Sequence, residues 1–68
     1  MSNLKPIIIL VDTQLAENIG LAARAMYNFG LVNLSLVRPK IEWPSKKAEA
    51  VSVDALPIIK NAKCYDTL

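Results

Sequence analysis

The sequence predicts an α/β fold: the N-terminal half of a Rossmann-like parallel sheet, arranged strand, helix, strand, helix, strand. An unbroken run of apolar, mostly β-branched residues at 7–11 is typical of a strand buried on both faces of such a sheet. A helical pattern and a second apolar run follow within about 30 residues, the length of one right-handed βαβ unit. We expect residues 1–68 to form a single partial domain, because the chain is too short to hold a second.

The first strand is predicted at 7–11, since Pro6 and the branched side chains oppose a helix there. The first helix is predicted at about 18–29, with Asn18 as its N-cap and Gly30 as the left-handed residue beyond its end. One face of this helix is expected to be core: Leu21, Ala22, Ala25, Met26 and Phe29. The other face is expected to be exposed or to face a partner or a site: Gly20, Ala23, Arg24 and Tyr27.

The second strand is predicted at 31–37. Ser45 is expected to cap a second helix at 46–51, and Pro57 either ends that helix or begins a further short turn. A short third strand is predicted at 63–65. Together these elements give the predicted five-element order.

Composition excludes several chemistries. With only Gly20 and Gly30, the chain can form neither a G-x-G-x-x-G loop, which needs three glycines, nor a Walker loop, whose two glycines are five residues apart. It has no histidine, so we expect no imidazole base and no metal site. Its one cysteine, Cys64, cannot form an internal disulfide and is expected to be a small buried apolar residue in the third strand. The net charge of +2 permits contact with a polyanion but does not indicate one.

The sequence also favours a cytoplasmic protein without a membrane segment. Its longest apolar run, 6–11, is far shorter than the roughly 20 residues that span a bilayer. That run is not followed by the small residues of a signal-peptide cleavage site.

One group of residues points to chemistry. Asn18, Gly20 and Arg24 interrupt an otherwise apolar helix opening, and a glycine at this point suggests open surface beside the guanidinium. Arg24 could hold a phosphate or stabilise a developing oxyanion with a charge that persists at neutral pH. Asp12 follows the first strand, at the edge where open α/β sheets bind ligands. The alternative interpretation is a solvated surface arginine, a capping asparagine and a turn aspartate.

A family resemblance extends over most of the chain, in five segments: 8–12, 18–26, 28–31, 34–39 and 61–68. The first three resemble motif 1 of the SpoU/TrmH family of RNA ribose 2′-O-methyltransferases, within the SPOUT superfamily. The last two are similar to the tRNA-modifying members of that family. The most specific element is Asn-x-Gly-x-x-x-Arg, formed by Asn18, Gly20 and Arg24.

The resemblance implies transfer of a methyl group from S-adenosylmethionine to a ribose 2′-hydroxyl of tRNA or rRNA. It assigns Arg24 and Asn18 to catalysis, with Arg24 removing the hydroxyl proton or stabilising the oxyanion and Asn18 placed near the reacting nucleotide. Gly20 and Asp12 are expected to be substrate-binding residues, and Asp12 is expected to shape the loop after the first strand. We expect the Arg24 guanidinium to face the carboxyl ends of the strands.

The resemblance is incomplete. In this family the S-adenosylmethionine site and a deep trefoil knot come from a C-terminal half that matches nothing in these residues, and Asp54 stands near the place of a usual glycine. It therefore implies the N-terminal part of an enzyme, inactive as this isolated chain, whose relatives are homodimers with active sites near the subunit interface. The alternatives are a non-catalytic RNA-binding or dimerisation module, and a plain α/β fragment.

Four more side chains have alternative interpretations. Lys46 and Lys47 could contact RNA phosphates, although a solvated helix face explains them as well. Tyr27 and Trp43 could stack on a base, but Trp43 is expected to cover an edge of the core.

Overall fold

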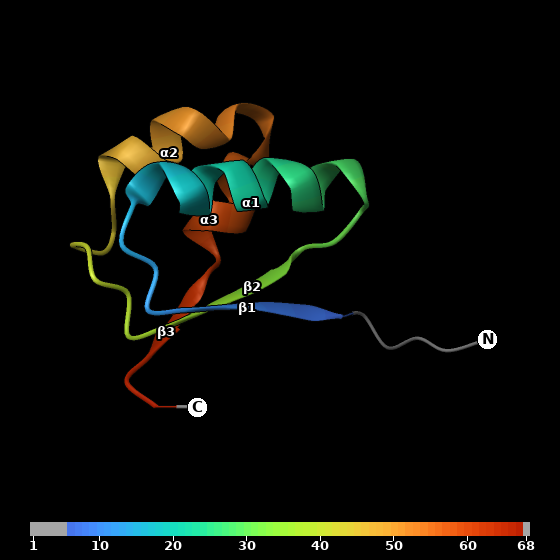
Figure 1. The fold of residues 1–68 in the computed structure, drawn as a ribbon. Helices are drawn as coiled ribbons and strands as arrows, with labels where there is room; N and C mark the ends of the chain where they lie inside the picture. Colours follow the sequence, from blue (N-terminus) through green and yellow to red (C-terminus); the bar gives the residue numbers. More distant parts are fainter. Residues whose placement is uncertain (1–5, 68) are drawn as a thin grey trace.

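The computed structural model describes residues 6–67. The elements follow the order β1 (Ile7–Val11), α1 (Ala16–Asn28), β2 (Asn33–Val37), α2 (Lys46–Ser52), the 3₁₀ turn η1 (Val53–Ala55), α3 (Leu56–Lys60) and β3 (Lys63–Tyr65). The strands form one parallel sheet in the order β1–β2–β3, and the helices lie over one of its faces (Figure 1). The predicted α/β order is confirmed, and Pro57 lies in the first turn of α3, so it begins a further element.

β2 is the central strand and carries the buried centre of the sheet. Its register pairs Ile7 with Asn33 and Val11 with Val37 across β1, and Leu36 with Cys64 across β3. Leu36 is completely buried between the sheet and the helices. The core joins side chains from β2, α1, α2, η1 and α3: Ala16, Ile19, Ala23, Met26, Leu34, Leu36, Ala48, Ala55, Ile58 and Ile59. Trp43 packs against this core from the loop before α2, as predicted.

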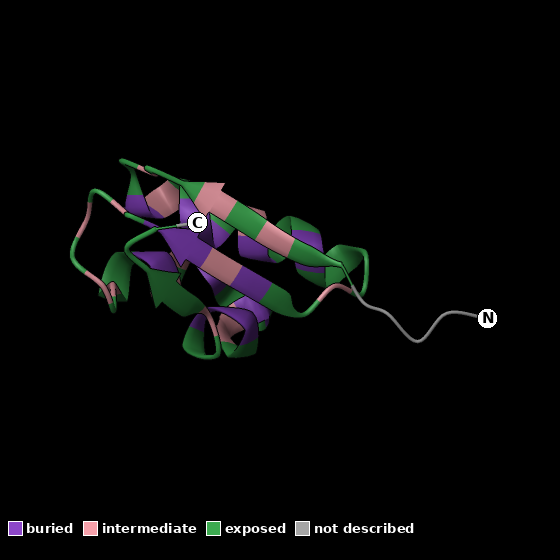
Figure 2. Ribbon diagram, turned by 90° about the horizontal axis from the view of Figure 1, so that it is seen from below, coloured by how far each residue is buried: buried purple, intermediate pink, exposed green. Residues whose placement is uncertain are grey.

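No described helix covers the opposite, bare face of the sheet, although Val37 at the end of β2 is buried there (Figure 1). In β1, Ile8 and Leu10 turn toward the helices, whereas Ile7, Ile9 and Val11 are 59%, 50% and 43% exposed (Figure 2). The expectation that this strand is buried on both faces is therefore wrong for the part of the chain that the structure describes. The unbroken apolar run at 7–11 is typical of a strand in a sheet with helices on both faces, but every described helix covers the same face.

The predicted core face of α1 is also wrong in part. Met26 is buried as expected, but Leu21 and Phe29 are exposed, while Gly20 and Ala23 are buried. The reason is that α1 packs against α2, η1 and α3 as well as against the sheet beneath it (Figure 1). Small residues of α1 face α2, where the two helix backbones approach closely. The prediction placed the core face by the large apolar side chains and therefore did not include these small residues.

The ends of the helices test the predicted caps. α1 begins at Ala16, two residues earlier than expected, and its N-cap is Leu15, which makes no side-chain hydrogen bond. Asn18 is thus inside the first turn, and its assignment as N-cap is wrong. Gly30 has a φ of +73°, the left-handed conformation predicted for it. The Ser45 hydroxyl accepts a hydrogen bond from the Ala48 N–H at 3.2 Å, which confirms the predicted cap of α2.

Candidate functional site

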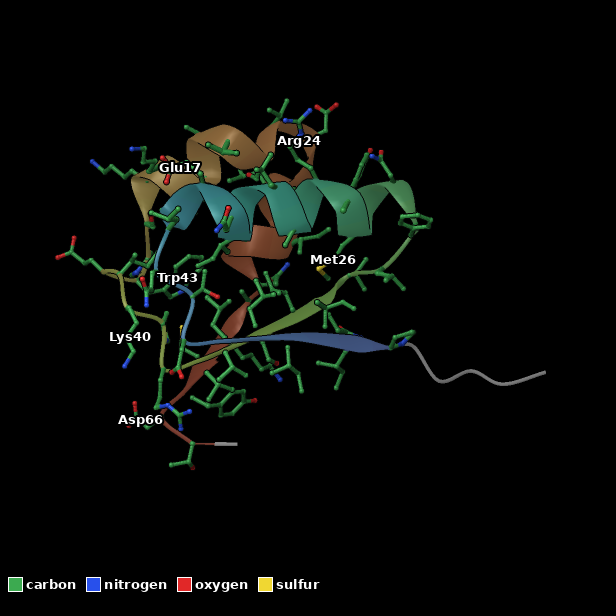
Figure 3. All side chains as sticks on the ribbon, viewed as in Figure 1. Glu17, Arg24, Met26, Lys40, Trp43 and Asp66 are labelled. Atoms are coloured by element: carbon green, nitrogen blue, oxygen red, sulfur yellow. The ribbon has the colours of Figure 1, made fainter. Side chains whose placement is uncertain are left out.

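Arg24 lies on the side of α1 that faces away from the sheet (Figure 3). Its expected orientation toward the carboxyl ends of the strands is therefore wrong. Within residues 6–67, its guanidinium makes neither an ion pair nor a hydrogen bond. A cation that the protein does not neutralise is available to an anionic ligand.

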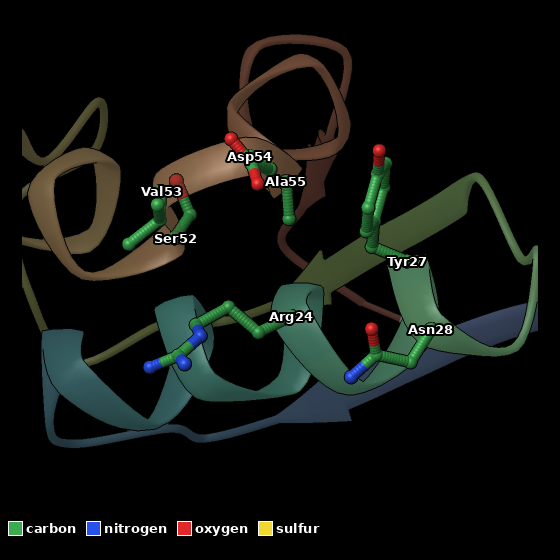
Figure 4. Close-up of a pocket in the computed structure, with 7 residues that line it drawn as sticks. All are labelled: Arg24, Tyr27, Asn28, Ser52, Val53, Asp54 and Ala55. Atoms are coloured by element: carbon green, nitrogen blue, oxygen red, sulfur yellow. The ribbon is translucent and has the colours of Figure 1, made fainter.

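A cavity of about 150 Å³ lies beside this guanidinium, between α1 and the corner where α2 passes into η1. α1 contributes one wall with Arg24, Tyr27 and Asn28, and the corner contributes the facing wall of residues 52–55 (Figure 4). The Ser52 hydroxyl is not available to a ligand, because the residue is completely buried and the hydroxyl donates to the Glu49 carbonyl at 2.7 Å. The groups that remain are a cation, a phenol, an amide and the Asp54 carboxylate.

The corner itself has a strained backbone. Val53 has a φ of +53° and a ψ of −116°, in a region that β-branched residues strongly avoid. A residue held in such a conformation costs of order 1–3 kcal/mol and often lies at a functional site. Here the turn sets the direction of the chain at 53–55, which lines the cavity.

Gly20 does not leave open surface beside Arg24, so that expectation is wrong. A Cβ at this position would lie 2.8 Å from the backbone carbonyl oxygen of Ala48 and 2.8 Å from the Cβ of Val51. The glycine is therefore required by the close approach of α1 and α2. Its packing explains the residue without any ligand.

Asn18 is exposed in the first turn of α1. At about 100° per residue, the six-residue step from Asn18 to Arg24 separates their side chains by about 120° around the helix. The two predicted catalytic residues thus share a helix but not a face. The structure does not bring the four predicted site residues, Asn18, Gly20, Arg24 and Asp12, together in one cavity of this chain.

Asp12 lies at the carboxyl edge of the sheet, as predicted from its place after the first strand. Its carboxylate accepts a hydrogen bond from Nε of Arg38 at 3.0 Å. The two strands end in the same way: the Asp12 N–H donates to the Val37 carbonyl, the Arg38 N–H donates to the Tyr65 carbonyl, and both residues then turn with positive φ. The hydrogen bond from Arg38, its charge and that of Lys40 lower the pKa of Asp12.

Arg38 is a polar residue of this edge that the sequence prediction missed. The signal was present, because Arg38 directly follows the second strand just as Asp12 directly follows the first. Parallel strands end at the same edge of a sheet, so polar residues at equivalent positions meet.

Three other side chains considered in the sequence, Lys46, Lys47 and Cys64, lie outside the cavity beside Arg24. Lys46 and Lys47 are exposed at the start of α2, and Nζ of Lys47 is 3.2 Å from a carboxylate oxygen of Glu17. The pKa of Glu17 is lowered by its own backbone N–H in the first turn of α1 and by Lys47. Cys64 is exposed, contrary to prediction, because β3 is a short edge strand. Partial desolvation raises its pKa, which disfavours the reactive thiolate.

Among residues 6–67, no helix has the length and apolar composition needed to cross a membrane. The same residues contain no cluster of three or more carboxylate or thiol side chains suited to a metal ion.

The chain is similar to proteins that bear one name, tRNA (cytidine/uridine-2′-O-)-methyltransferase TrmJ. It is 46% identical to that of Yersinia enterocolitica and 44% identical to that of Salmonella typhimurium, over 61 residues, or 90% of the chain, in each case. It covers 23% and 25% of these relatives, so it spans about a quarter of their length. No protein-family model matches the chain.

Solved structures give the same result. The crystal structure of TrmJ from Z. mobilis matches 94% of the chain with a TM-score of 0.90 and 47% identity, and the chain covers 29% of it. A probable methyltransferase from Bordetella pertussis matches 90% of the chain with a TM-score of 0.85 and 30% identity, and the chain covers 38% of it. The predicted resemblance to RNA ribose 2′-O-methyltransferases is confirmed.

Proposed function

We propose that residues 1–68 are the N-terminal half of the catalytic domain of a cytoplasmic, S-adenosylmethionine-dependent tRNA ribose 2′-O-methyltransferase. The similarity to proteins named as tRNA 2′-O-methyltransferases over 90% of the chain supports the reaction class. The observation that carries the proposal to particular residues is the unpaired guanidinium of Arg24 beside a cavity.

Arg24 is proposed as the catalytic cation. A ribose hydroxyl is a weak nucleophile, so its proton must leave, or its developing negative charge must be stabilised, as it attacks the methyl group. A guanidinium remains charged at neutral pH and is not weakened here by an internal carboxylate among the described residues. Its role is to bind the reacting oxygen and stabilise negative charge there.

The other predicted site residues receive different roles. We assign Asn18 to the support of the reacting nucleotide, because it is exposed on α1 and free to contact RNA. Asp12 shapes the loop after β1 through its ion pair with Arg38. Gly20 acts through helix packing, which holds α2 against α1 and so forms the cavity.

The cavity on the bare face of the sheet does not fit S-adenosylmethionine. The cavity of about 210 Å³ on the bare face of the sheet is lined by Ile7, Ile9, Ser35, Val37, Tyr65 and Thr67. This lining has no cation for the carboxylate of the cofactor and no carboxylate for its amino group or ribose hydroxyls. Because the resemblance assigns the cofactor site to a C-terminal half that matches nothing in these residues, we propose that this site lies outside 1–68, and the isolated chain is expected to be inactive.

A homodimer is part of the proposal, with no metal and no membrane. The outer side of α1 that carries Arg24 leaves the guanidinium accessible to groups from a partner subunit (Figure 3). A non-catalytic RNA-binding or dimerisation module is the second candidate, favoured by the exposure of the large apolar side chains Leu21 and Phe29 on α1.

Methyl transfer to unmodified tRNA from labelled S-adenosylmethionine tests the assignment. In the full-length methyltransferase, Arg24→Ala is expected to lower turnover about 10²–10³-fold, the effect of removing one oxyanion-stabilising donor. Arg24→Lys keeps the charge but loses the planar fork, so an intermediate rate is expected. Lys60→Ala removes an exposed cation from α3 and serves as the control.

Thermal unfolding of each variant shows whether the fold is intact. Near wild-type turnover of Arg24→Ala would contradict the catalytic role. Methyl transfer by the 68-residue chain alone would contradict the proposed location of the cofactor site. A full-length protein that binds tRNA and S-adenosylmethionine without transfer would favour the second candidate.

A further inference from the structure

The guanidinium of Arg38 has free donors at the carboxyl edge of the sheet. Its Nε donates to a carboxylate oxygen of Asp12 at 3.0 Å, and the guanidinium makes no other hydrogen bond within residues 6–67. The two terminal amino groups, which carry four of the five N–H donors of an arginine, therefore have no partner there. The side chain is 45% exposed, so these donors are accessible from solvent.

Asp12 holds Arg38 by the base of the guanidinium and not by its tip. Both residues directly follow a strand, on neighbouring strands of the sheet, and both turn with positive φ, of 55° and 46°. The terminal nitrogens lie beyond Nε in the side chain, so the ion pair does not occupy them. An arginine anchored in this way presents a preoriented fork to an anion with two oxygens.

A second cation lies near the same carboxylate. The hydrogen bond from Arg38 and the charges of Arg38 and Lys40 lower the pKa of Asp12. The Lys40 N–H donates to the Thr13 carbonyl at 2.8 Å, which joins the loops that follow β1 and β2. The Lys40 side chain is exposed, extends outward from this edge and forms no ion pair within residues 6–67 (Figure 3). Two cations thus share one carboxylate, which leaves this group of three side chains with a net positive charge.

We propose that Arg38 and Lys40 bind a backbone phosphate of the tRNA and that Asp12 positions Arg38 for this contact, an inference that rests on the proposed function. The terminal amino groups of arginine match two phosphate oxygens, and lysine adds a point charge. Open α/β sheets bind their ligands at this edge. The loop after β1 leads into α1, so the contact fixes the RNA backbone near the start of the helix that carries Arg24.

Asp66 supplies an opposing charge at this edge. It directly follows β3, is exposed and forms no ion pair within the described part of the chain (Figure 3). Its carboxylate repels a phosphate without holding Arg38. Removing this charge and removing Arg38 should therefore have opposite effects on tRNA binding.

The test is tRNA binding and turnover by the full-length methyltransferase. Arg38→Ala is expected to raise the Kd for tRNA about tenfold, measured without a methyl donor, and to reduce the slope of log Kd against log salt by about 1, the loss of one phosphate contact. The KM for tRNA is expected to rise while kcat stays unchanged, because the bound phosphate takes no part in methyl transfer. The effect is expected to be equal for tRNAs with cytidine or uridine at the modified position, since a phosphate contact carries no base information.

Three more variants of cationic residues check this result. Arg38→Lys keeps the charge and loses the fork, so the salt slope is expected to stay at the parent value while affinity falls about threefold. Lys40→Ala is expected to weaken binding about threefold and to reduce the slope. Lys63→Ala removes an exposed cation at the start of β3, on the opposite edge of the sheet, and is the matched control with unchanged Kd. Thermal unfolding shows whether each variant is folded.

Two substitutions of Asp12 separate positioning from charge. Asp12→Asn and Asp12→Ala both remove the carboxylate charge, but asparagine keeps an oxygen that accepts a hydrogen bond from Nε of Arg38. Asp12→Ala is therefore expected to bind tRNA about threefold more weakly than Asp12→Asn. Asp66→Asn removes the opposing charge and is expected to bind tRNA more tightly than the parent.

An Arg38→Ala protein with the parent Kd and salt slope, or one that loses kcat at unchanged KM, would overturn the inference. Equal affinities of the two Asp12 variants would overturn the positioning role. Parent turnover and KM in Arg38→Ala would retain the proposed function and refute the phosphate contact. A protein that binds tRNA with the expected salt dependence but transfers no methyl group would refute the proposed function and retain the contact.

Discussion

The carboxyl edge of the sheet and the outer side of α1 each carry an exposed arginine, but only the arginine at the edge forms an ion pair among the described residues. At the edge, Arg38 is paired with Asp12 at 3.0 Å, and the backbone around both residues continues the hydrogen bonds of the sheet. On the outer side of α1, Arg24 has no partner among the described residues, and its cavity is bounded by a strained valine. The fold thus provides a partner for Arg38, whereas it provides none for Arg24 among the described residues.

The two regions are also stabilised by different interactions. The edge depends on polar groups that are about half exposed, which contribute little to stability. The outer side of α1 depends on the close approach of two helices at Gly20. Substitutions that disturb helix packing should therefore have larger effects than substitutions that break the ion pair.

The largest effect on stability is expected from Gly20→Ala. The added Cβ would lie 2.8 Å from the Ala48 carbonyl oxygen, which is backbone and cannot move without shifting α2. Although alanine favours helix, we expect the free energy of unfolding to fall by about 2 kcal/mol, the usual cost of overpacking. Urea unfolding measures it, with Ala25→Val at an exposed position of α1 as the control.

A Gly20→Ala protein more stable than the parent would show that α1 and α2 are not closely packed. The contrast between the two regions would then lose its structural basis.

Val53→Gly is expected to have a smaller effect of opposite sign. Glycine adopts a φ of +53° without steric cost, so the substitution should raise the free energy of unfolding by about 1 kcal/mol. Thermal and urea unfolding measure the gain. Val32→Gly, at an exposed valine with negative φ, is the matched control and should destabilise. Equal losses in both variants would mean that Val53 is not strained.

The smallest effect is expected from Asp12→Asn. The pKa of Asp12 is lower in the folded chain than in the unfolded chain, so the ion pair stabilises the fold above about pH 4, the unfolded value. That stabilisation is lost as the pH falls through the lower, folded pKa. The difference in unfolding midpoint between variant and parent should thus be slight at neutral pH and vanish in acid.

Glu42→Gln is the control for this experiment, because Glu42 is exposed and forms no ion pair within residues 6–67. A large loss of stability at neutral pH on Asp12→Asn would mean that the edge, and not the helix pair, holds the fold.

The elements of the fold followed from local signals. The residues at 7–11, the turn at Gly30, the cap at Ser45 and the strand at 63–65 each predicted their own conformation, because each signal acts within a few residues. The start of α1 was misplaced, since Asn18 is a good capping residue that the chain does not use. A weak local preference of this kind is easily overridden by packing of Ala16 and Ile19 in the core.

The site was harder to predict. The Asn-x-Gly-x-x-x-Arg pattern identified Arg24 as the residue of interest, and its exposure agreed with the predicted polar face of the helix. Its surroundings were wrong, because the spacing of residues in α1 says nothing about which neighbour lies against each face. Asp54 entered the cavity only because α2 and η1 fold back along α1 (Figure 4).

The sequence by itself determined the order of strands and helices, the parallel sheet and the resemblance that names the reaction class. These properties depend on hydrophobic periodicity, on caps and on motifs, which are all written within short segments. Only the tertiary structure decided that Gly20 is buried under α2, that Asp12 meets Arg38 and that Arg24 shares a cavity with Asp54. Each of these pairs joins residues far apart in the chain, and their distance is set by how whole elements pack.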